Sequence, residues 1–387
     1  MQQLVETTKE IMARLVGFES LSGEPNLDMI DYIKSYLIGL GVEPMISHDE
    51  TGEKANLFAV IGPNVDGGVL FNGHTDVVPT LGQDWSQDPF KMIERDGRLI
   101  GRGTVDMKGF LACSLAMVPR FQAADLKKPI LISFCYDEEI GGFGAPILAN
   151  DIIERGPKPA VAIVGEPTTM ILVSGHKAGL ELRTEFTGFA AHASDPRKGV
   201  NAVEFAARFI NKIIEIANRC SIAPYHDSPF EPPYTTFNIG TLNGGVARNI
   251  TANACALDWE LRPMPGEDGQ VILAELQYFV DSELLPLMRA VYPDASVKTA
   301  VEADVPGLSA DESSPAVQFI RSVTGLNSSE VVSFGTDAGH FDRVGISTIV
   351  FGPGSIEQAH KPDEYIELSE ISNCLTFMQQ VADHLSE

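Results

Sequence analysis

The chain has 387 residues, of which 44% are hydrophobic and 21% are charged, and its formal net charge at pH 7 is −25. This composition is that of a globular protein with one or two domains, and the negative charge argues against nucleic acid or an anionic membrane as a partner. No stretch approaches the roughly 18 consecutive apolar residues of a membrane span. The N-terminus has helical periodicity rather than the apolar core of a signal peptide, and no Cys-x-x-Cys spacing occurs, so we expect a cytoplasmic protein without a disulfide framework.

Five short apolar runs, taken in chain order, each lead into side chains of the types that bind metal ions. Runs of this kind that alternate with helical stretches predict an α/β fold with a mostly parallel sheet, in which functional groups gather beyond the carboxyl ends of the strands. We therefore expect the side chains after the runs to meet at one edge of the sheet. They are His74 and Asp76 after residues 70–71, Asp106 after residues 99–100 and before a helix over 109–120, Glu138 and Glu139 after residues 130–136, Glu166 after residues 160–165, and His360 in the loop after residues 347–351.

The number of candidate ligands favours a centre with two metal ions. Two imidazoles and three carboxylates are more than one tetrahedral zinc ion needs, and a carboxylate that bridges two ions about 3.5–4 Å apart would use the whole set. Glu138 and Glu139 are neighbours that point in different directions, so one can bind metal while the other takes a proton from water. Any one of these residues alone would be interpreted as a solvated loop acid or a hydrogen-bonded His–Asp pair.

Residues 179–304 have a different pattern and predict an inserted domain. Strands are expected at 180–187, 235–242, 251–262 and 297–301, and helices at 201–217 and 271–288. The resulting order βαββαβ is a split, ferredoxin-like α+β unit, and it contains none of the proposed metal ligands. We expect residues 1–178 and 305–387 to form the catalytic metal-binding domain and residues 179–304 to form a lid, because clefts between domains are common ligand sites.

Several residues outside the ligand set are candidates for handling a substrate. His192 has small neighbours that leave its ring accessible, and Asn249 lies in a Gly-rich turn whose simpler interpretation is a hairpin. Arg262 ends a strand, where its guanidinium could hold a substrate carboxylate or form a surface ion pair. Gly335 and Thr336 belong to a Gly-rich loop at a strand end; a phosphate cradle is the rival interpretation, but no P-loop Lys-Ser/Thr follows.

The motifs together resemble those of the acetylornithine deacetylase, succinyl-diaminopimelate desuccinylase and aminoacylase family of co-catalytic zinc amidohydrolases. The matching segments are residues 73–79, 101–109, 137–139, 165–168 and 359–364. The resemblance implies a zinc-aminopeptidase-like catalytic domain that holds two Zn²⁺ ions, for which Co²⁺ or Mn²⁺ can substitute. It implies that Asp106 bridges the ions, that His74 and Glu166 complete one site, and that Glu139 and His360 complete the other.

The same resemblance implies the remaining roles. Glu138 would be the general base, Asp76 would orient His74, and His192 would polarise the scissile carbonyl. The chain would be a homodimer joined through its lid domains, with His192 serving the active site of the partner, and the peptide bond from Asp106 to Met107 would be cis. The residues expected to bind substrate are Arg262, Asn249, Thr336, Gly335 and Lys177.

Within this family, residues 164–168 and 174–179 are most similar to the acetylornithine branch. That similarity implies hydrolysis of the small-molecule N-acyl amino acid N2-acetyl-L-ornithine to L-ornithine and acetate, a step of arginine biosynthesis. The alternatives are a succinyl-diaminopimelate desuccinylase, a broad-specificity aminoacylase or a non-catalytic paralogue, which would be expected to lose Glu138 or His192. A nucleotide-binding protein is rejected because Gly101 and Gly103 lack the third glycine in register. No role follows from the sequence for His176 or His340.

Overall fold

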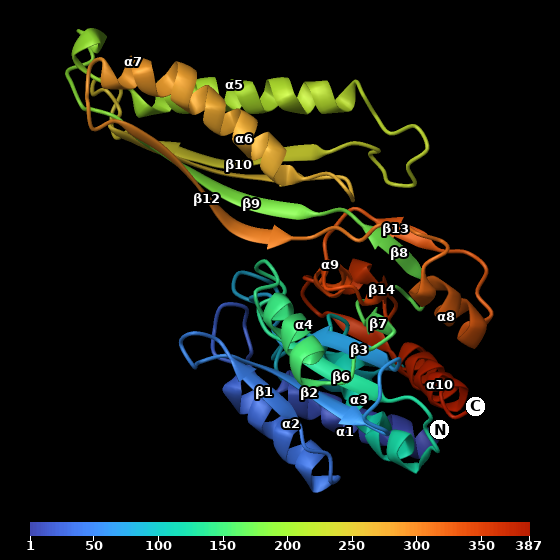
Figure 1. The fold of residues 1–387 in the computed structure, drawn as a ribbon. Coiled ribbons are helices and arrows are strands. Elements are labelled where there is room, and N and C mark those ends of the chain that lie inside the picture. The colour runs from blue at the N-terminus through green and yellow to red at the C-terminus, as the bar shows by residue number, and fades with distance from the viewer. The chain divides into compact units, whose positions relative to one another are not determined.

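The computed structural model describes residues 1–387, and the chain forms two compact units (Figure 1). Unit 1 comprises Met1–His176, Leu308–Val332 and Thr336–Glu387. Unit 2 comprises Lys177–Gly307 and Ser333–Gly335, so its main segment is inserted in the sequence of unit 1. None of the helices has the length and apolar composition that crossing a membrane requires.

Unit 1 is built on an eight-stranded sheet in the order β1-β2-β6-β3-β7-β14-β8-β13. The pairs β6–β3, β3–β7, β7–β14 and β8–β13 are parallel, and the other pairs are antiparallel. The prediction of an α/β fold with a mostly parallel sheet is confirmed. The strands are β1 (Met45–His48), β2 (Ala55–Ile61), β3 (Val69–His74), β6 (Ile130–Cys135), β7 (Val161–Val164), β8 (Val173–His176), β13 (Glu330–Val332) and β14 (Ser347–Val350).

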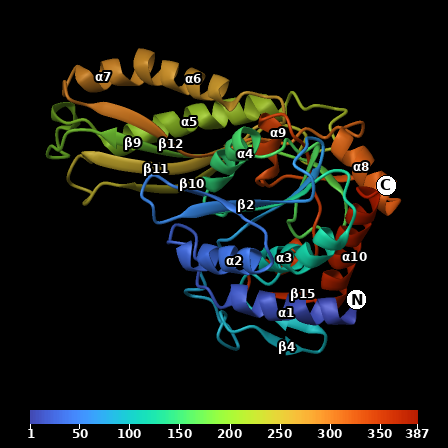
Figure 2. The same cartoon turned by 60° about the horizontal axis from the view of Figure 1, so that its bottom comes forward.

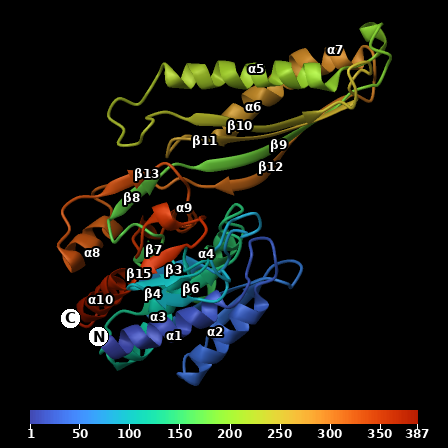
Figure 3. The same ribbon diagram turned by 180° about the vertical axis from the view of Figure 1, so that it is seen from behind.

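Helices cover both faces of this sheet, because successive side chains of a strand point to opposite faces. In β7, Val161 and Ile163 join one core, and Ala162 and Val164 join the other. The two sets of helices can be followed in Figure 3. The first core includes α1 (Gln2–Val16), α2 (Leu27–Gly39), α3 (Lys108–Ala123), α8 (Pro315–Thr324) and α10 (Leu368–His384), and the second includes α4 (Gly144–Arg155) and α9 (Ala338–Arg343).

A separate three-stranded antiparallel sheet corrects one expectation. It has the order β15-β5-β4, with β4 (Ile93–Arg95), β5 (Arg98–Ile100) and β15 (Tyr365–Glu367), and it lies on the α1 side of unit 1, where Lys9 contacts Glu94 at 2.6 Å (Figure 2). The run 99–100 was expected to be a strand of the main sheet. It pairs with β4 instead, because Asp96 and Gly97 both have positive φ angles, 53° and 78°, and form the tight turn of a hairpin.

Unit 2 is a four-stranded antiparallel sheet with helices packed on one face (Figure 1). Its strand order is β10-β11-β9-β12, and its elements follow the predicted βαββαβ sequence. His176 and Leu308 of unit 1, which precede and follow its main segment in the sequence, form an antiparallel bridge with N–O distances of 3.0 and 2.9 Å. The elements are β9 (Gly179–Thr187), α5 (Ala202–Ser221), β10 (Thr236–Gly244), β11 (Ala254–Arg262), α6 (Gly269–Phe279), α7 (Leu285–Arg289) and β12 (Ser296–Val305).

The helix predicted over 271–288 is interrupted. Val280–Leu284 forms a π-helical turn between α6 and α7, and Pro286 lies in the first turn of α7. Proline has no backbone N–H and cannot continue the hydrogen-bond ladder of an α-helix, so the wider turn accommodates it.

Candidate metal centre

The carboxyl ends of adjacent strands lie in one row, and this places the residues that follow them together. His74 of β3 pairs with Cys135 of β6, and Val164 of β7 pairs with Val350 of β14. Gly165 follows β7 and donates its N–H to Asn72 at 3.0 Å. A Cβ at Gly165 would lie 2.2 Å from the Phe110 ring, so glycine lets α3 pack against the turn that carries Glu166.

Asp106 reaches the same edge from a different direction, through the loop between β5 and α3. Its Oδ1 lies 3.0 Å from Nε2 of His74, and its Oδ2 lies 3.2 Å from Nε2 of His360. One carboxylate therefore stands between two imidazoles, as a bridging ligand would. The Asp106–Met107 peptide bond is cis, as the resemblance implied.

The remaining candidate ligands lie on either side of Asp106. Glu166 Oε1 is 3.7 Å from His74 Nε2, and Glu139 Oε2 is 3.0 Å from His360 Nε2. Ligand atoms of His74, Asp106 and Glu139 lie within 4.8 Å of one another, and so do those of His74, Glu138 and Glu166. The structure brings together all the ligand candidates from the sequence, and it adds Glu138 to the cluster.

The charges of this cluster favour the binding of cations. Burial and then the negative charge of neighbouring carboxylates raise the pKa values of Glu138, Glu139 and Glu166, with Glu166 acting on Glu138 and Asp106 acting on the other two. Hydrogen bonds to Asp106 and Glu139 raise the pKa of His360 to about 10. Glu166 Oε1 is buried and has no hydrogen-bond partner. Divalent cations would relieve this repulsion and satisfy the oxygen, and nitrogen with carboxylate oxygen is a donor set that zinc accepts.

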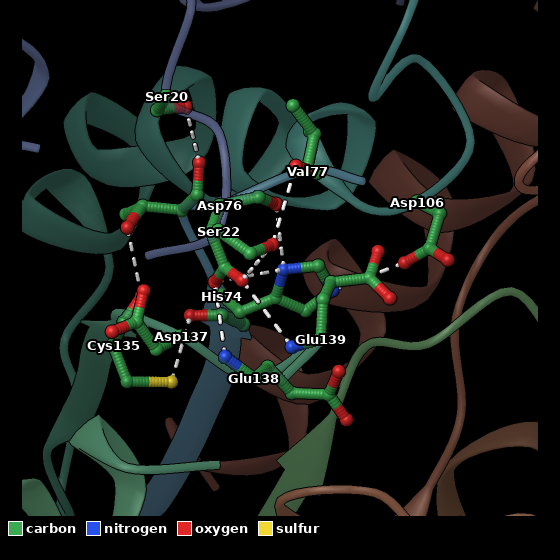
Figure 4. A network of polar contacts seen from close by, with 12 residues as sticks. Ser20, Ser22, His74, Asp76, Val77, Asp106, Cys135, Asp137, Glu138 and Glu139 are labelled. Atoms are coloured by element: carbon green, nitrogen blue, oxygen red, sulfur yellow. Dashed lines mark hydrogen bonds and ion pairs between the residues drawn. The ribbon is translucent and has the colours of Figure 1, made fainter. Parts of the chain in front are cut away.

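Asp76 contacts the backbone of Glu138 and Glu139 more closely than it contacts the His74 ring (Figure 4). Its carboxylate accepts the N–H groups of Glu138 at 3.1 Å and Glu139 at 3.2 Å, and the hydroxyl of Ser22 at 2.8 Å. Nδ1 of His74 lies 2.9 Å from the backbone oxygen of Asp76 and 3.5 Å from its carboxylate. A hydrogen bond from Nδ1–H to that backbone oxygen leaves Nε2 to face Asp106.

Asp337 is a further buried acid at this centre, and no sequence pattern had indicated it. It precedes α9, and its Oδ2 accepts a hydrogen bond from the Cys135 thiol at 2.8 Å. Burial raises the pKa of Asp337 to about 6. The only signal available was one acid in a Gly-rich loop, which is more often a solvated turn residue. Thr336, its neighbour, is buried in unit 1, and its hydroxyl accepts the N–H of Ala338 at 3.1 Å.

The other residues expected to handle substrate belong to unit 2. Asn249 is exposed, and its backbone oxygen accepts the N–H of Ala193 at 3.1 Å, so the loops of His192 and Asn249 are paired. Nδ1 of His192 accepts the N–H of Ser194 at 3.2 Å. Because Nδ1 is an acceptor, a neutral ring carries its proton on Nε2 and can donate there.

Two cationic candidates of unit 2 have protein partners. Arg262 forms a two-point contact with Glu260, with nitrogen–oxygen distances of 2.9 and 3.2 Å, which is the ion pair weighed above as the alternative to a substrate clamp. The ammonium of Lys177 donates to the backbone oxygens of Pro232 at 2.6 Å and Tyr234 at 2.9 Å. Gly335 also lies in unit 2. Substrate roles for these three residues stay predictions.

This α/β fold places a cluster of imidazoles and carboxylates at one sheet edge, an arrangement that suits a metal-dependent hydrolase. Residues 70–384 match the family model of Peptidase family M20/M25/M40. The chain is 34% identical over 382 residues to an acetylornithine deacetylase of Photorhabdus laumondii subsp. laumondii, a match that covers 97% of this chain and 96% of the relative. The chain therefore belongs to Peptidase family M20/M25/M40, and the resemblance stated from the motifs is confirmed.

Solved structures share the fold at low sequence identity. An M20 family metallo-carboxypeptidase of Sulfolobus solfataricus matches with a TM-score of 0.76 and 16% identity, covering 98% of this chain and 99% of that one. An aminopeptidase of Bacillus cereus matches with a TM-score of 0.72 and 20% identity, covering 99% of both chains. A dinuclear metal-binding peptidase of the M20 family from Bacillus subtilis matches with a TM-score of 0.66 and 14% identity, covering 99% of this chain and 98% of that one.

Proposed function

We propose that this enzyme hydrolyses N2-acetyl-L-ornithine to L-ornithine and acetate, with two Zn²⁺ ions per chain, as a cytoplasmic step of arginine biosynthesis. The observation that carries the proposal is the position of the Asp106 carboxylate, 3.0 Å from His74 and 3.2 Å from His360. A carboxylate shared in this way is what a two-ion centre requires. The choice of substrate is supported by the relative of 34% identity, which is named acetylornithine deacetylase. The free cysteines agree with a reducing compartment.

The residues would divide the work as follows. His74, Asp106 and Glu166 would hold one ion, and Asp106, Glu139 and His360 the other; when bound, the ions supply Lewis acidity toward the attacking water and the carbonyl oxygen. Glu138 would take a proton from the attacking water and return it to the amine nitrogen as that nitrogen leaves. Burial and Glu166 raise the pKa of Glu138, which suits a group that must both accept and donate a proton near neutral pH.

Residues of unit 2 are the proposed groups that handle the substrate. His192 would donate from Nε2 to the oxygen that becomes negative when the carbonyl is attacked, and its Nδ1 already accepts from Ser194. Arg262 would bind the substrate carboxylate after exchanging its Glu260 partner. Asn249, Lys177, Gly335 and Thr336 are the other proposed substrate-binding residues.

We further propose that the protein is a homodimer joined through unit 2. The strands β10 and β12 are the edges of the four-stranded sheet, and each has a neighbour on one side only. β10 is mostly exposed along its length. An unpaired edge strand favours association with another chain, and a two-fold contact is the commonest way to close it. In that dimer, His192 would serve the active site of the partner.

A substrate panel tests the function. The purified enzyme, loaded with zinc, is assayed on N-acetylornithine, N-succinyl-diaminopimelate and N-acetylmethionine, and each assay is repeated with a chelator and after zinc, cobalt or manganese is restored. We expect the highest kcat/KM with N-acetylornithine and complete loss of turnover with chelator. A higher kcat/KM with the succinyl substrate would replace the proposed substrate by the desuccinylase alternative. Turnover that survives verified metal removal would refute the metal-dependent mechanism.

A further inference from the structure

Arg102 and Glu364 form a buried ion pair behind the metal centre. Both side chains are 1% exposed, and Nη1 of Arg102 lies 2.6 Å from Oε2 of Glu364. The small sheet brings them together, because Ile100 of β5 pairs with Tyr365 of β15. Burying two charges is costly unless further hydrogen bonds satisfy them, so the partners of their remaining polar atoms indicate what the pair is for.

The second oxygen of Glu364 holds the backbone of the bridging ligand. Its Oε1 accepts the N–H of Val105 at 3.0 Å and that of Asp106 at 3.2 Å. A carboxylate that accepts two backbone N–H groups fixes the peptide planes on which they lie. The position of Asp106 is therefore set by Glu364, and the position of Glu364 by Arg102.

Gln83 connects the Arg102 guanidinium to His360, the ligand on the other side of the second ion site. Its Oε1 accepts from Nη2 of Arg102 at 2.6 Å and from Nε1 of Trp85 at 3.0 Å. Because both neighbours are donors, the orientation of the amide is determined. Its Nε2 then donates to the backbone oxygen of His360 at 3.0 Å.

The hydrogen bond from Gln83 matters for His360 because this ligand is more exposed than Asp106. Its side chain is 51% exposed, whereas that of Asp106 is 6% exposed, and its φ angle of 61° is one that non-glycine residues rarely adopt. Ala359 beside it is buried in the core of unit 1, but the His360 side chain itself has little packing to hold it in place. The network Gln83–Arg102–Glu364 thus contacts the backbone of Asp106 at one end and that of His360 at the other. Oδ2 of Asp106 lies 3.2 Å from Nε2 of His360.

We propose that Gln83, Arg102 and Glu364 form a positioning network that sets the spacing of Asp106 and His360 and thereby the affinity of the second metal site. The inference rests on the proposed function, in which these two residues hold a cation. Groups that orient metal ligands typically change metal affinity by about 10- to 100-fold when they are removed. Gln83 is the member to test, because it is only half-buried and its replacement leaves the buried ion pair in place.

The experiment titrates the metal-free protein with Co²⁺ and follows each binding step by visible absorption and calorimetry. Gln83→Met removes both hydrogen-bonding functions without adding charge, and Gln83→Glu keeps the acceptor for Arg102 but removes the donor to His360. Gln87→Met and Gln87→Glu are matched controls from the same loop, because Gln87 reaches only the carbonyl of Ile100, at 3.4 Å. Circular dichroism of each metal-free variant checks that it is folded.

We expect both Gln83 variants to weaken one of two Co²⁺ steps by about 10- to 100-fold, and both Gln87 variants to match the parent protein. His360→Ala identifies which step belongs to the second site, and adding Gln83→Met to it should cause no further loss, because Gln83 acts through His360. Parent-like titrations of both Gln83 variants, or additive losses in the double variant, would overturn the network while leaving the proposed function intact. A parent protein that binds a single ion would overturn the ligand assignment and the network with it.

Discussion

Replacing the two adjacent glutamates one at a time separates proton transfer from metal binding. Glu138→Gln preserves shape and volume and keeps the backbone N–H that donates to Asp76 at 3.1 Å. It removes the carboxylate that would accept a proton, and it removes one negative charge close to Glu166. Glu139→Gln keeps the equivalent N–H contact with Asp76, 3.2 Å long, but it replaces the carboxylate that lies 3.0 Å from His360.

We expect Glu138→Gln to lower the rate and Glu139→Gln to lower the affinity for metal. Loss of a general base lowers the rate by about 10²- to 10⁴-fold, which corresponds to about 3–5 kcal/mol in activation free energy. Metal binding should change less in Glu138→Gln than in Glu139→Gln, because Glu138 is assigned to neither ion site and contributes only its charge beside Glu166. A contact with a charged group is worth about 1.5–3 kcal/mol, so Glu139→Gln should lose about 10- to 150-fold in affinity for one ion.

The assay measures kcat and KM for N-acetylornithine at saturating zinc, together with metal content after dialysis and Co²⁺ titration. Glu138→Gln should lose kcat with two ions retained, and Glu139→Gln should recover part of its kcat as the metal concentration is raised. If Glu138→Gln kept the kcat of the parent, its assignment as the base would be wrong. If the two variants lost metal equally, the proposed division between the two carboxylates would fail.

Three further outcomes follow from particular contacts. Mixing His192→Ala chains with Glu138→Ala chains should restore activity if His192 acts in the partner's site, since one site of each mixed dimer is then intact; verified mixed dimers that remain inactive would place His192 in its own chain. Burial lowers the pKa of His340 from 6.5 to about 4, so the unfolded chain binds the extra proton between these values and stability falls as the pH decreases through that window. The difference of about 2.5 pKa units corresponds to about 3 kcal/mol in the free energy of unfolding. Measured by urea unfolding, this free energy should decrease by that much less in His340→Gln than in the parent between pH 7 and pH 4; equal decreases in the two proteins would contradict this. Gly165→Ala should destabilise the fold by about 1–3 kcal/mol, because the new Cβ would lie 2.2 Å from the Phe110 ring, and an unchanged urea midpoint would show that the ring can move away.

The centre could be predicted from the sequence where a strand delivers the ligand. His74, Glu139 and Glu166 each follow a buried run, and the register of parallel neighbours then brings them together without further information. Asp106 was selected by the same argument, although a hairpin and a loop deliver it. The motif of residues 101–109 correctly indicated Asp106, although the strand before it belongs to the small sheet and not to the main one.

Contacts between distant segments could not be predicted. Asp337 meets Cys135 across 202 positions of sequence, and nothing in a Gly-rich loop distinguishes a buried acid from a solvated one. The carboxylate of Asp76 was assigned to the His74 ring, yet its shortest contacts include the backbone of residues that lie more than 60 positions further along the chain. Lys177 was selected from its motif, and that motif gave no indication that its ammonium donates to carbonyls beyond residue 230; its substrate role stays a prediction. In each case the contact depends on tertiary packing, which the local sequence pattern does not predict.

The bridge between His176 and Leu308 makes the main segment of unit 2, Lys177–Gly307, exchangeable. A segment whose two ends are already neighbours adds little loop-closure cost to its host, because that cost rises only slowly with length. The residues between these ends can therefore be spliced out as a cassette, or replaced by another module, while the strands that carry the ligands keep their order. Recombination at this one point would give a descendant a new substrate preference or a new mode of assembly, provided that the new module also supplies a donor in place of His192.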